Sequence, residues 1–523
     1  MARQKSEDRI QPKSRRKSAS TRGNERPGGG EAVPVNEQAW QLGLPFGTAE
    51  NGDGKPPPLV GDAARGLPRA AASAGPKPKV KDKTAMSATM EEVTKRLDEA
   101  FQSVASNKGA PGPDWQTIEQ VQACWVYLRE ELAAALLEGT YRPGDIRRVW
   151  IPKAAGGQRG LGIPNVIDRV VQEAVRRELE PQHEPTFHPN SHGFRPNRSC
   201  HTAIQQAQRY LEDGYEWVVD LDLEKFFDRV SHQRLMARLA QRIEDRRLLV
   251  LIGRMLKVKV VMPDGVKVST EEGVPQGGPL SPLLSNIVLD ELDWELARRG
   301  HRFVRYADDC NVYVRSERAG LRVIASLTDF IERRLRLKVN ADKSAVARPE
   351  ERHFLGFSLR RSPLDGEVAV LLSKRSQERL AAKVVELTPR NGGTSLKACI
   401  SSVNAYLLGW LGHFGICSAG AATTMRTTDA HIRRRLRAIQ LVHWKRKSTI
   451  ATKLTKLGVS KRAAWRGIYK GRQSLWALSH SSAVNRGLRN AYFAERGLVS
   501  LAEQWRARHQ PIAAPAQLCL ALG

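Results

Sequence analysis

The chain has 523 residues, enough for several domains, and its 84 Lys and Arg against 55 Asp and Glu give a formal net charge of +29. This charge excludes an acidic solvating protein and favours a polyanionic partner, nucleic acid before an anionic membrane. The sequence has no apolar run of about 18 residues, which argues against a membrane-spanning helix. Its six scattered cysteines form no C-x-x-C pair, which argues against a zinc ribbon and a disulfide framework.

Residues 1–88 differ in composition from the rest of the chain, because they are rich in Pro and Gly and contain only two aromatic residues. Such a segment cannot bury enough apolar surface to fold, so we predict a disordered basic leader. This leader is either an arm that touches nucleic acid or an extension with no role. Residues 89–145 are predicted to be helical, with one helix stopping at Gly109 and a second at Gly139.

Short β-like runs follow the helical segment. RRVWIPK and RGLGIPNV flank a glycine pair and predict two strands around a turn. Residues 168–180 then have the spacing of an amphipathic helix, which we expect Asp168 to cap and Pro181 to stop. Further along, an Asp-Gly pair between two β-branched runs at 260–268 predicts a hairpin.

Two groups of acids are placed at the ends of predicted strands. Asp220 and Asp222 alternate with apolar residues, so both carboxylates share one face of a strand. Asp308 and Asp309 lie between two short apolar strands and would form the tip of a hairpin. Carboxylates from separate strands can hold two Mg²⁺ ions for phosphoryl transfer. An isolated Asp-Asp pair is usually only an exposed turn, so the catalytic interpretation depends on the segments around it.

Beyond residue 372 the β pattern fades and successive helices are predicted. Residues 424–447 contain eight Lys or Arg and one acid, Asp429, which predicts a basic surface. The tail adds aromatic residues among further Lys and Arg, which would form either a stacking surface for nucleic acid or a small core. These aromatic residues are Trp465, Tyr469, Trp476 and Tyr492.

Several of these segments together resemble a known family. YADD at 306–309 is similar to the catalytic hairpin of reverse transcriptases, and VVDLDLEKFFD at 218–228 to their first catalytic strand. GVPQGGPLSPLLSNIVLDELD, SHGFRPNRSCHTAI, RGLGIPNVIDRVVQEAV and LKVNADKS match in the same order. The chain resembles bacterial group II intron reverse transcriptase-maturases, class C-like and lacking the endonuclease module. The match runs from about Asn107 to about Phe357, and the helical region after 372 resembles the family's maturase and thumb segment.

The resemblance implies an α+β fold, a right-hand polymerase whose fingers and antiparallel-sheet palm precede an all-helical thumb/maturase region. It divides the chain into a leader and four further regions. These are the leader 1–88, an N-terminal helical extension of the fingers at 89–145, fingers and palm at 146–360, the thumb/maturase domain at 373–447 and a basic C-terminal region at 448–523.

The resemblance also implies roles for individual residues. Asp222, Asp308 and Asp309 would be the catalytic, metal-binding carboxylates, with Leu223 as a further metal ligand. Asp222 is favoured over Asp220 because it alone fits the family pattern D-x-x-x-F-F-D. Lys343 would be a general acid near the leaving pyrophosphate, although VNADKS departs from the family's usual wording there.

Substrate contacts follow in the same way. Phe227 would close the sugar pocket and reject a 2′-hydroxyl, while it can also pack in the core. Gln276 and Gly277 would line the incoming nucleotide, and Arg159 and Arg169 would clamp its triphosphate. For each arginine taken alone, a surface salt bridge is the safer interpretation. Nucleic-acid contacts are implied at Arg433, Arg434, Arg437, Lys445 and Arg446.

The family implies two Mg²⁺ ions as cofactor, with Mn²⁺ as a substitute. Its partners would be intron RNA, an RNA template with a DNA primer, target DNA and deoxynucleoside triphosphates, with no membrane. A cytoplasmic ribonucleoprotein associated with the bacterial nucleoid is expected. Three alternatives stay open: a domesticated or phage-defence reverse transcriptase, a catalytically silent RNA-binding splicing factor, and an RNA-templated RNA polymerase.

Overall fold

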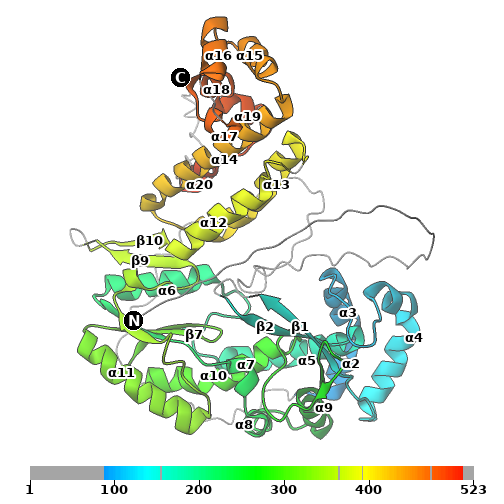
Figure 1. Cartoon of the computed structure of the whole chain (residues 1–523). Coiled ribbons are helices and arrows are strands. Elements are labelled where there is room, and N and C mark those ends of the chain that lie inside the picture. The colour runs from blue at the N-terminus through cyan, green and yellow to red at the C-terminus, as the bar shows by residue number, and fades with distance from the viewer. Residues whose placement is uncertain (1–87, 153–155, 363–365, 392, 471–473, 510–523) are drawn as a thin grey trace, which may run out of the picture.

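The computed structural model describes residues 88–152, 156–362, 366–391, 393–470 and 474–509. The predicted leader therefore lies outside the described residues, except for residue 88. Figure 1 shows a broad body of helices and sheets and, above it, a lobe built from the last helices of the chain. None of the described helices is long and apolar enough to cross a bilayer.

The first helices confirm the predicted helical start and refine it. One predicted helix is two, α2 (Met90–Lys95) and α3 (Leu97–Ser106), separated at Arg96. α4 (Ile118–Leu137) begins with a capping box, in which Thr117 and Gln120 bond each other's main chain, and ends before Gly139 at φ +69°.

A small four-stranded sheet follows, in the order β2-β1-β4-β5. β1 (Ile146–Pro152) and β2 (Gln158–Ile163) are antiparallel, as the glycine pair between them predicts. β4 (Val260–Val261) pairs parallel to β1 and antiparallel to β5 (Lys267–Val268), so the predicted Asp-Gly hairpin is confirmed.

The next helix corrects the sequence prediction. α5 spans Val166–His183, so it starts earlier than expected and continues past Pro181. Asp168 is not its cap, because the helix begins after Asn165 and places Asp168 in the first turn. Its carboxylate instead accepts hydrogen bonds from Tyr141 Oη and from the Gly144 main-chain N–H. Pro181 lies in the last turn, where its missing N–H removes only one helical bond and the chain can still complete the turn.

The main sheet has the strand order β6-β7-β3-β8, with every pair antiparallel. Its strands are β3 (Trp217–Leu221), β6 (Arg302–Tyr306), β7 (Asp309–Val314) and β8 (Ala345–Ala347). Both faces of this sheet are buried. Val219, Phe303 and Val312 belong to one hydrophobic core, whereas Val218, Val304 and Tyr313 belong to a second.

Helices cover the two faces of the main sheet and join it to the small one. They are α6 (Cys200–Glu212), α7 (Phe226–Arg229), α8 (His232–Leu239), α9 (Arg246–Leu256), α10 (Ser281–Arg298) and α11 (Glu317–Phe330). A hairpin of β9 (Phe357–Arg361) and β10 (Val368–Leu372) lies between this body and the helices that follow (Figure 1).

After residue 372 the described residues form helices and no strand, as predicted. The long ones are α12 (Lys374–Leu387), α13 (Leu396–Phe414) and α14 (Ala422–Trp444). The lobe continues with α15 (Lys447–Lys456), α16 (Lys461–Tyr469), α17 (Leu475–Leu478), α18 (Ser482–Gly487), α19 (Asn490–Ala494) and α20 (Leu501–His509). An α+β body followed by a helical lobe is the predicted fold class.

Candidate active site

The three acids singled out from the sequence meet at one end of the main sheet. Leu221 on β3 lies opposite Cys310 on β7, and Tyr306 on β6 lies opposite Asp309. One further step of the β3–β7 register brings Asp222 across from Asp309, and residues paired in this way have Cβ atoms about 5 Å apart. Acids from distant parts of the chain therefore share one site.

The tip of the catalytic hairpin is a two-residue turn, Ala307–Asp308, between β6 and β7. Ala307 adopts φ +57°, a left-handed conformation that costs energy for a residue other than glycine. Asp308 is half-buried and Asp309 remains open to solvent, although protein surrounds it on most sides. The turn therefore presents its two carboxylates at the sheet's end.

Surrounding protein atoms and mutual repulsion raise the pKa of both acids. Removal from water raises the pKa of Asp309 to about 8, and the negative charges of Asp308, Asp220 and Asp222 add to the shift. Removal from water also raises the pKa of Asp308, whereas the positive charge of Arg159 opposes that rise. A cluster of acids that cannot all ionise alone calls for a cation.

Asp222 points to the same need. Its Oδ2 atom is buried and accepts no hydrogen bond, although the Lys343 ammonium lies 3.3 Å away. Among the described residues, no three His, Cys, Asp or Glu side chains form a ready-made metal cage. Mg²⁺ needs no such cage, because it is typically held by one or two carboxylates together with waters and substrate phosphates. The carboxylates present therefore fit divalent ions that bind together with a nucleotide.

The neighbouring Asp220 is already paired. The guanidinium of Arg352 donates two hydrogen bonds to its Oδ2, at 2.9 and 2.6 Å, and a third to the main-chain carbonyl of Lys343. Asp222 has only the ammonium of Lys343 nearby and accepts no hydrogen bond at Oδ2, which supports its choice over Asp220 as the metal-binding acid. Nothing in the sequence marked Arg352 as the partner, since 132 residues separate it from Asp220.

Leu223 can contribute only its main chain. Its apolar side chain is buried in the core, and its backbone pairs with Val339 in an isolated bridge. The bridge is flanked by hydrogen bonds from Asn340 N–H to the Asp222 carbonyl and from Glu224 N–H to the Lys338 carbonyl. A metal contact at this residue would therefore use its carbonyl oxygen.

Phe227 is buried on α7 and holds a loop. Its ring is buried and packs edge-on against Phe226, with centroids 5.2 Å apart. Its carbonyl accepts a hydrogen bond of 2.6 Å from the Val274 N–H. Gly273 adopts φ +97°, and a Cβ there would lie 2.9 Å from that carbonyl. Core packing and a place at the site, the two interpretations of Phe227, are thus compatible.

The same loop reaches the small sheet through Gln276. Its carbonyl accepts a 2.6 Å hydrogen bond from Gly162 N–H, and its Oε1 accepts one of 2.8 Å from Arg159 Nε. Gly277 has φ +125°, and a Cβ there would lie 2.3 Å from the Gly162 carbonyl. The loop, Arg159 and the acids therefore form one connected site.

Arg169 behaves differently from Arg159. It is buried on α5, and its Nη2 donates a hydrogen bond of 2.8 Å to the Ala110 carbonyl. Burial lowers its pKa. In this structure Arg169 anchors the loop after α3, so contact with a triphosphate would require that loop to yield its hydrogen bond.

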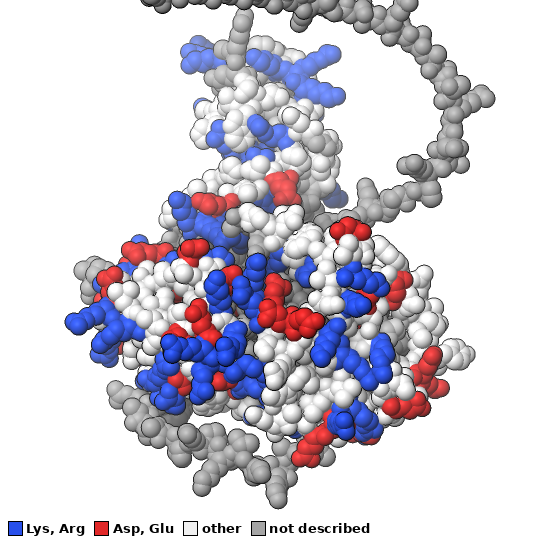
Figure 2. All heavy atoms as spheres, turned by 60° about the horizontal axis from the view of Figure 1, so that its bottom comes forward, with Lys and Arg blue, Asp and Glu red and all other residues white. Residues whose placement is uncertain are grey.

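The predicted basic surface divides into two groups. Arg435 is buried and bonds the carbonyl of Thr388, and Arg437 bonds the carbonyl of Leu488, so both are used inside the lobe. Arg426, Lys445 and Arg446 are exposed, and Arg433 is partly exposed. In Figure 2 the far lobe shows Lys and Arg with few acids, whereas the two signs intermingle over the body.

The aromatic residues of the tail divide in the same way. Trp465 and Tyr469 stack with ring centroids 5.4 Å apart and remain exposed. Trp476 receives Arg434 on its face, with Cζ 4.2 Å from the ring centroid. Tyr492 is buried. Tyr492 is thus part of a core, whereas a contact surface at Trp465 and Tyr469 stays a prediction.

Comparisons with known proteins identify two matching domain families. Residues 151–359 match the family described as reverse transcriptase (RNA-dependent DNA polymerase). Residues 377–458 match the group II intron, maturase-specific domain. The chain is 34% identical to protein YkfC of Escherichia coli K12 over 348 residues, which cover 59% of this chain and 89% of that protein.

Two further relatives carry intron names. The chain is 39% identical over 202 residues to the group II intron-encoded protein LtrA of Lactococcus lactis, covering 37% of this chain and 32% of LtrA. It is 28% identical over 324 residues to the putative COX1/OXI3 intron 2 protein of Saccharomyces cerevisiae, covering 50% of this chain and 38% of that protein. The chain thus spans about a third of the length of these two.

Proposed function

The chain belongs to the family of group II intron reverse transcriptase-maturases, and we propose that Asp222, Asp308 and Asp309 carry its polymerase reaction. It is an RNA-directed DNA polymerase by that membership. Such enzymes depend on divalent metal ions, and we propose two Mg²⁺ ions, with Mn²⁺ as a substitute, held by these acids and the Leu223 carbonyl. The observation that carries the assignment is the register that pairs the end of β3 with the YADD turn.

The reaction joins a primer 3′-hydroxyl to the α-phosphate of a deoxynucleoside triphosphate. Bound divalent ions neutralise charge on the attacking and leaving oxygens. The chain positions the reactants: Phe227 excludes a 2′-hydroxyl, and Gln276 and Gly277 line the nucleotide and its template base. Arg159, which already contacts Gln276, binds the triphosphate, and Arg169 joins it when its loop moves. Lys343 delivers a proton to the leaving pyrophosphate.

The test is primer extension on poly(rA)/oligo(dT). Wild type should make cDNA, and Asp308→Ala should lower the rate by at least about 10²-fold, because a preorganised charge at the reacting phosphate is lost. Undiminished synthesis in Asp308→Ala would overturn the assignment. Intron RNA binding without any product from wild type would favour a catalytically silent splicing factor instead.

We also propose that the exposed basic residues of the helical lobe bind RNA. The partners would be the intron RNA, an RNA–DNA duplex and target DNA in a cytoplasmic, nucleoid-associated ribonucleoprotein. The maturase activity of the family is tested by group II intron splicing at low Mg²⁺. Splicing that proceeds equally well without the protein would refute that role for this chain.

The division of the chain remains a proposal as well. We place the fingers and palm at 146–360 and the thumb/maturase domain at 373–447, between a helical extension at 89–145 and a basic region from 448 onward. The matched segments 151–359 and 377–458 support this division. Residues 89–372 can be expressed alone and their folding monitored by circular dichroism, which would test the boundary between the palm and the thumb/maturase domain.

A further inference from the structure

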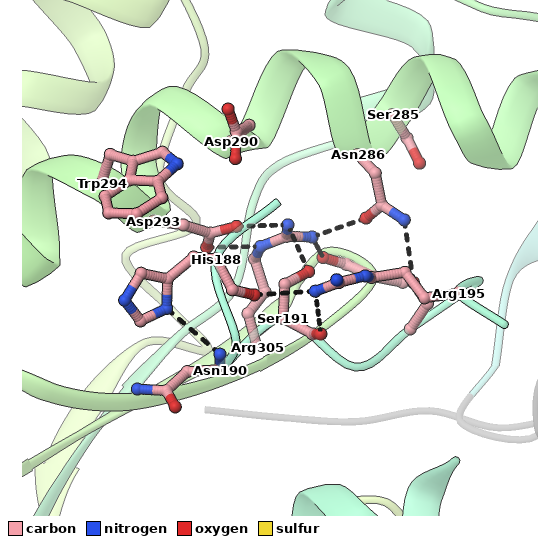
Figure 3. A network of polar contacts seen from close by, with 12 residues as sticks. His188, Asn190, Ser191, Arg195, Ser285, Asn286, Asp290, Asp293, Trp294 and Arg305 are labelled. Atoms are coloured by element: carbon pink, nitrogen blue, oxygen red, sulfur yellow. Dashed lines mark hydrogen bonds and ion pairs between the residues drawn. The ribbon is translucent and has the colours of Figure 1, made fainter. Parts of the chain in front are cut away.

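A charged residue with no accessible surface, Arg305, lies two residues before the Ala307–Asp308 turn. Arg305 is on β6, and its side chain is completely buried. Its guanidinium has five N–H groups, and all five are used (Figure 3). Nε and one N–H of Nη2 donate to the Asp293 carboxylate, and the second N–H of Nη2 donates to Ser191 Oγ. Nη1 donates to Asn286 Oδ1 and to the Ala307 carbonyl.

The partners come from three separate parts of the chain. Asp293 and Asn286 lie on α10, Ser191 lies in the loop before α6, and Ala307 is the first residue of the turn. The main chain of Arg305 is fixed too, because its N–H bonds the Asn190 carbonyl and its carbonyl accepts the His192 N–H. One side chain thus ties the turn to a helix and to a loop.

The loop presses directly on the turn. Asn286 donates a hydrogen bond of 2.9 Å from Nδ2 to the Gly193 carbonyl, so α10 holds this loop as well. A Cβ on Gly193 would lie 2.2 Å from the Ala307 nitrogen, which only glycine can avoid. Ala307 keeps its left-handed φ of +57° under these contacts. An uncommon backbone conformation persists only where the surroundings impose it.

Stability alone is a poor explanation for this arrangement. A buried ion pair is often no more stabilising than apolar side chains of the same volume, because both charges lose their hydration. What the ion pair supplies here, and apolar residues would not, is a directed hydrogen bond to the Ala307 carbonyl. That carbonyl belongs to the peptide bond whose nitrogen is in Asp308.

We propose that Arg305, oriented by Asp293 and Asn286, is a positioning residue that fixes the Ala307–Asp308 turn in the geometry in which Asp308 meets Asp222. The inference rests on the proposed function of those two acids. Arg305 touches no substrate and acts only through the turn. Its loss should therefore lower the rate of the chemical step and the affinity for divalent ions, with little effect on nucleotide binding.

Two variants test the proposal. Asn286→Ala keeps the Arg305–Asp293 ion pair, and therefore the fold, but removes the acceptor that orients Nη1 toward the turn. Arg305→Lys keeps the charge but cannot form five hydrogen bonds. The matched control is Glu178→Gln, which removes a buried carboxylate paired with Arg96, the residue between α2 and α3. All three are expected to melt at a lower temperature than wild type.

Single-nucleotide incorporation and Mn²⁺ titration calorimetry on the protein alone separate the outcomes. We expect kcat to fall about 10- to 100-fold in Asn286→Ala, as a small displacement of a reacting group does, with KM for the nucleotide nearly unchanged and weaker Mn²⁺ binding. Glu178→Gln should keep the kcat and Mn²⁺ affinity of wild type. Values in Asn286→Ala equal to those of the control would overturn the proposal. Wild type that makes no cDNA would refute the proposed function, whereas the Mn²⁺ titration would still test the positioning.

Discussion

The Lys343 ammonium lies 3.3 Å from Asp222 Oδ2, a buried oxygen that accepts no hydrogen bond. The Lys343 side chain is 67% exposed, so it can swing away when another cation or a phosphate arrives. Lys343 thus lies at the acid that is expected to bind metal, which is compatible with its proposed role as a general acid. This relationship gives the first prediction.

Lys343→Ala should lower kcat for nucleotide incorporation by about 10²-fold, the typical contribution of a general acid. Its effect on the melting temperature should be small, because an exposed ion pair contributes at most about 1 kcal/mol. Single-turnover primer extension and thermal melting measure the two effects. A large drop in melting temperature that accompanies the loss of rate would show that Lys343 has a structural role.

The raised pKa of Asp309 predicts how stability depends on pH. The folded chain holds this proton up to about pH 8, whereas the unfolded chain releases it near the ordinary value of 3.8. Folding therefore takes up a proton in this window, and the contribution of Asp309 to stability is lost as the pH rises through it. Thermal melting from pH 5 to pH 9 should show a flatter profile for Asp309→Asn than for wild type.

Divalent ions should reverse that pH effect. They bind the ionised carboxylates and compete with the proton, so Mg²⁺ should raise the melting temperature more at pH 8 than at pH 6. Asp309→Asn should lose most of this difference. A Mg²⁺ effect that is the same at both pH values, in both proteins, would contradict a metal site at these acids.

Phe227→Ala should increase incorporation of ribonucleotides from a low wild-type level, because the aromatic side chain no longer blocks the 2′-hydroxyl. Phe226→Ala is the matched control, since it is an adjacent buried Phe that packs against the same ring. Both variants should lose about 3–5 kcal/mol of stability as large-to-small core changes. Competition assays with rUTP and dTTP on poly(rA) should separate them, and equal sugar selectivity would refute the role of Phe227.

The exposed basic residues predict the salt dependence of RNA binding. Arg433→Gln and Arg446→Gln should each weaken binding across RNA sequences and reduce the slope of log K against log salt by about 1. Arg298→Gln on α10 is the control, because its guanidinium is exposed and paired with Glu295 in the body. Filter binding between 50 and 200 mM salt measures the slopes. An unchanged slope in both lobe variants would place the RNA elsewhere.

The convergence of Asp222 with Asp308 was implied by the resemblance to reverse transcriptases, whereas strand alternation and the two-acid turn predicted only the local placement of each acid. Partners set by long-range packing could not be predicted. Arg435 lies in an unbroken basic run, yet it is buried against Thr388, and nothing local separates it from the partly exposed Arg433. The prediction that Pro181 stops the helix was wrong for a similar reason. The cost of a proline depends on how near it lies to the helix end, and the fold sets that end.

The burial of Arg305 could have been predicted from its sequence neighbours. Arg305 is the one charge inside the otherwise apolar run FVRY, whose neighbours Phe303 and Val304 are wholly buried. A charge inside an apolar run predicts a buried, paired group. The partner could not be predicted, because Asp293 is one of four acids in DELDWE at 290–295. Only the fold shows that Arg305 pairs with Asp293 and also bonds the Ala307 carbonyl.

The loop from Gly273 to Gly278 is joined by main-chain hydrogen bonds to α7 through Phe227 and to β2 through Gly162. A rotation of the small sheet toward the main one would therefore drag the loop along. Phe227, with its proposed contact to the sugar, and Gln276, with its proposed contact to the base, would then move together. Selection for a broader choice of sugar would then alter copying accuracy as well, so the two traits would not evolve independently in this enzyme.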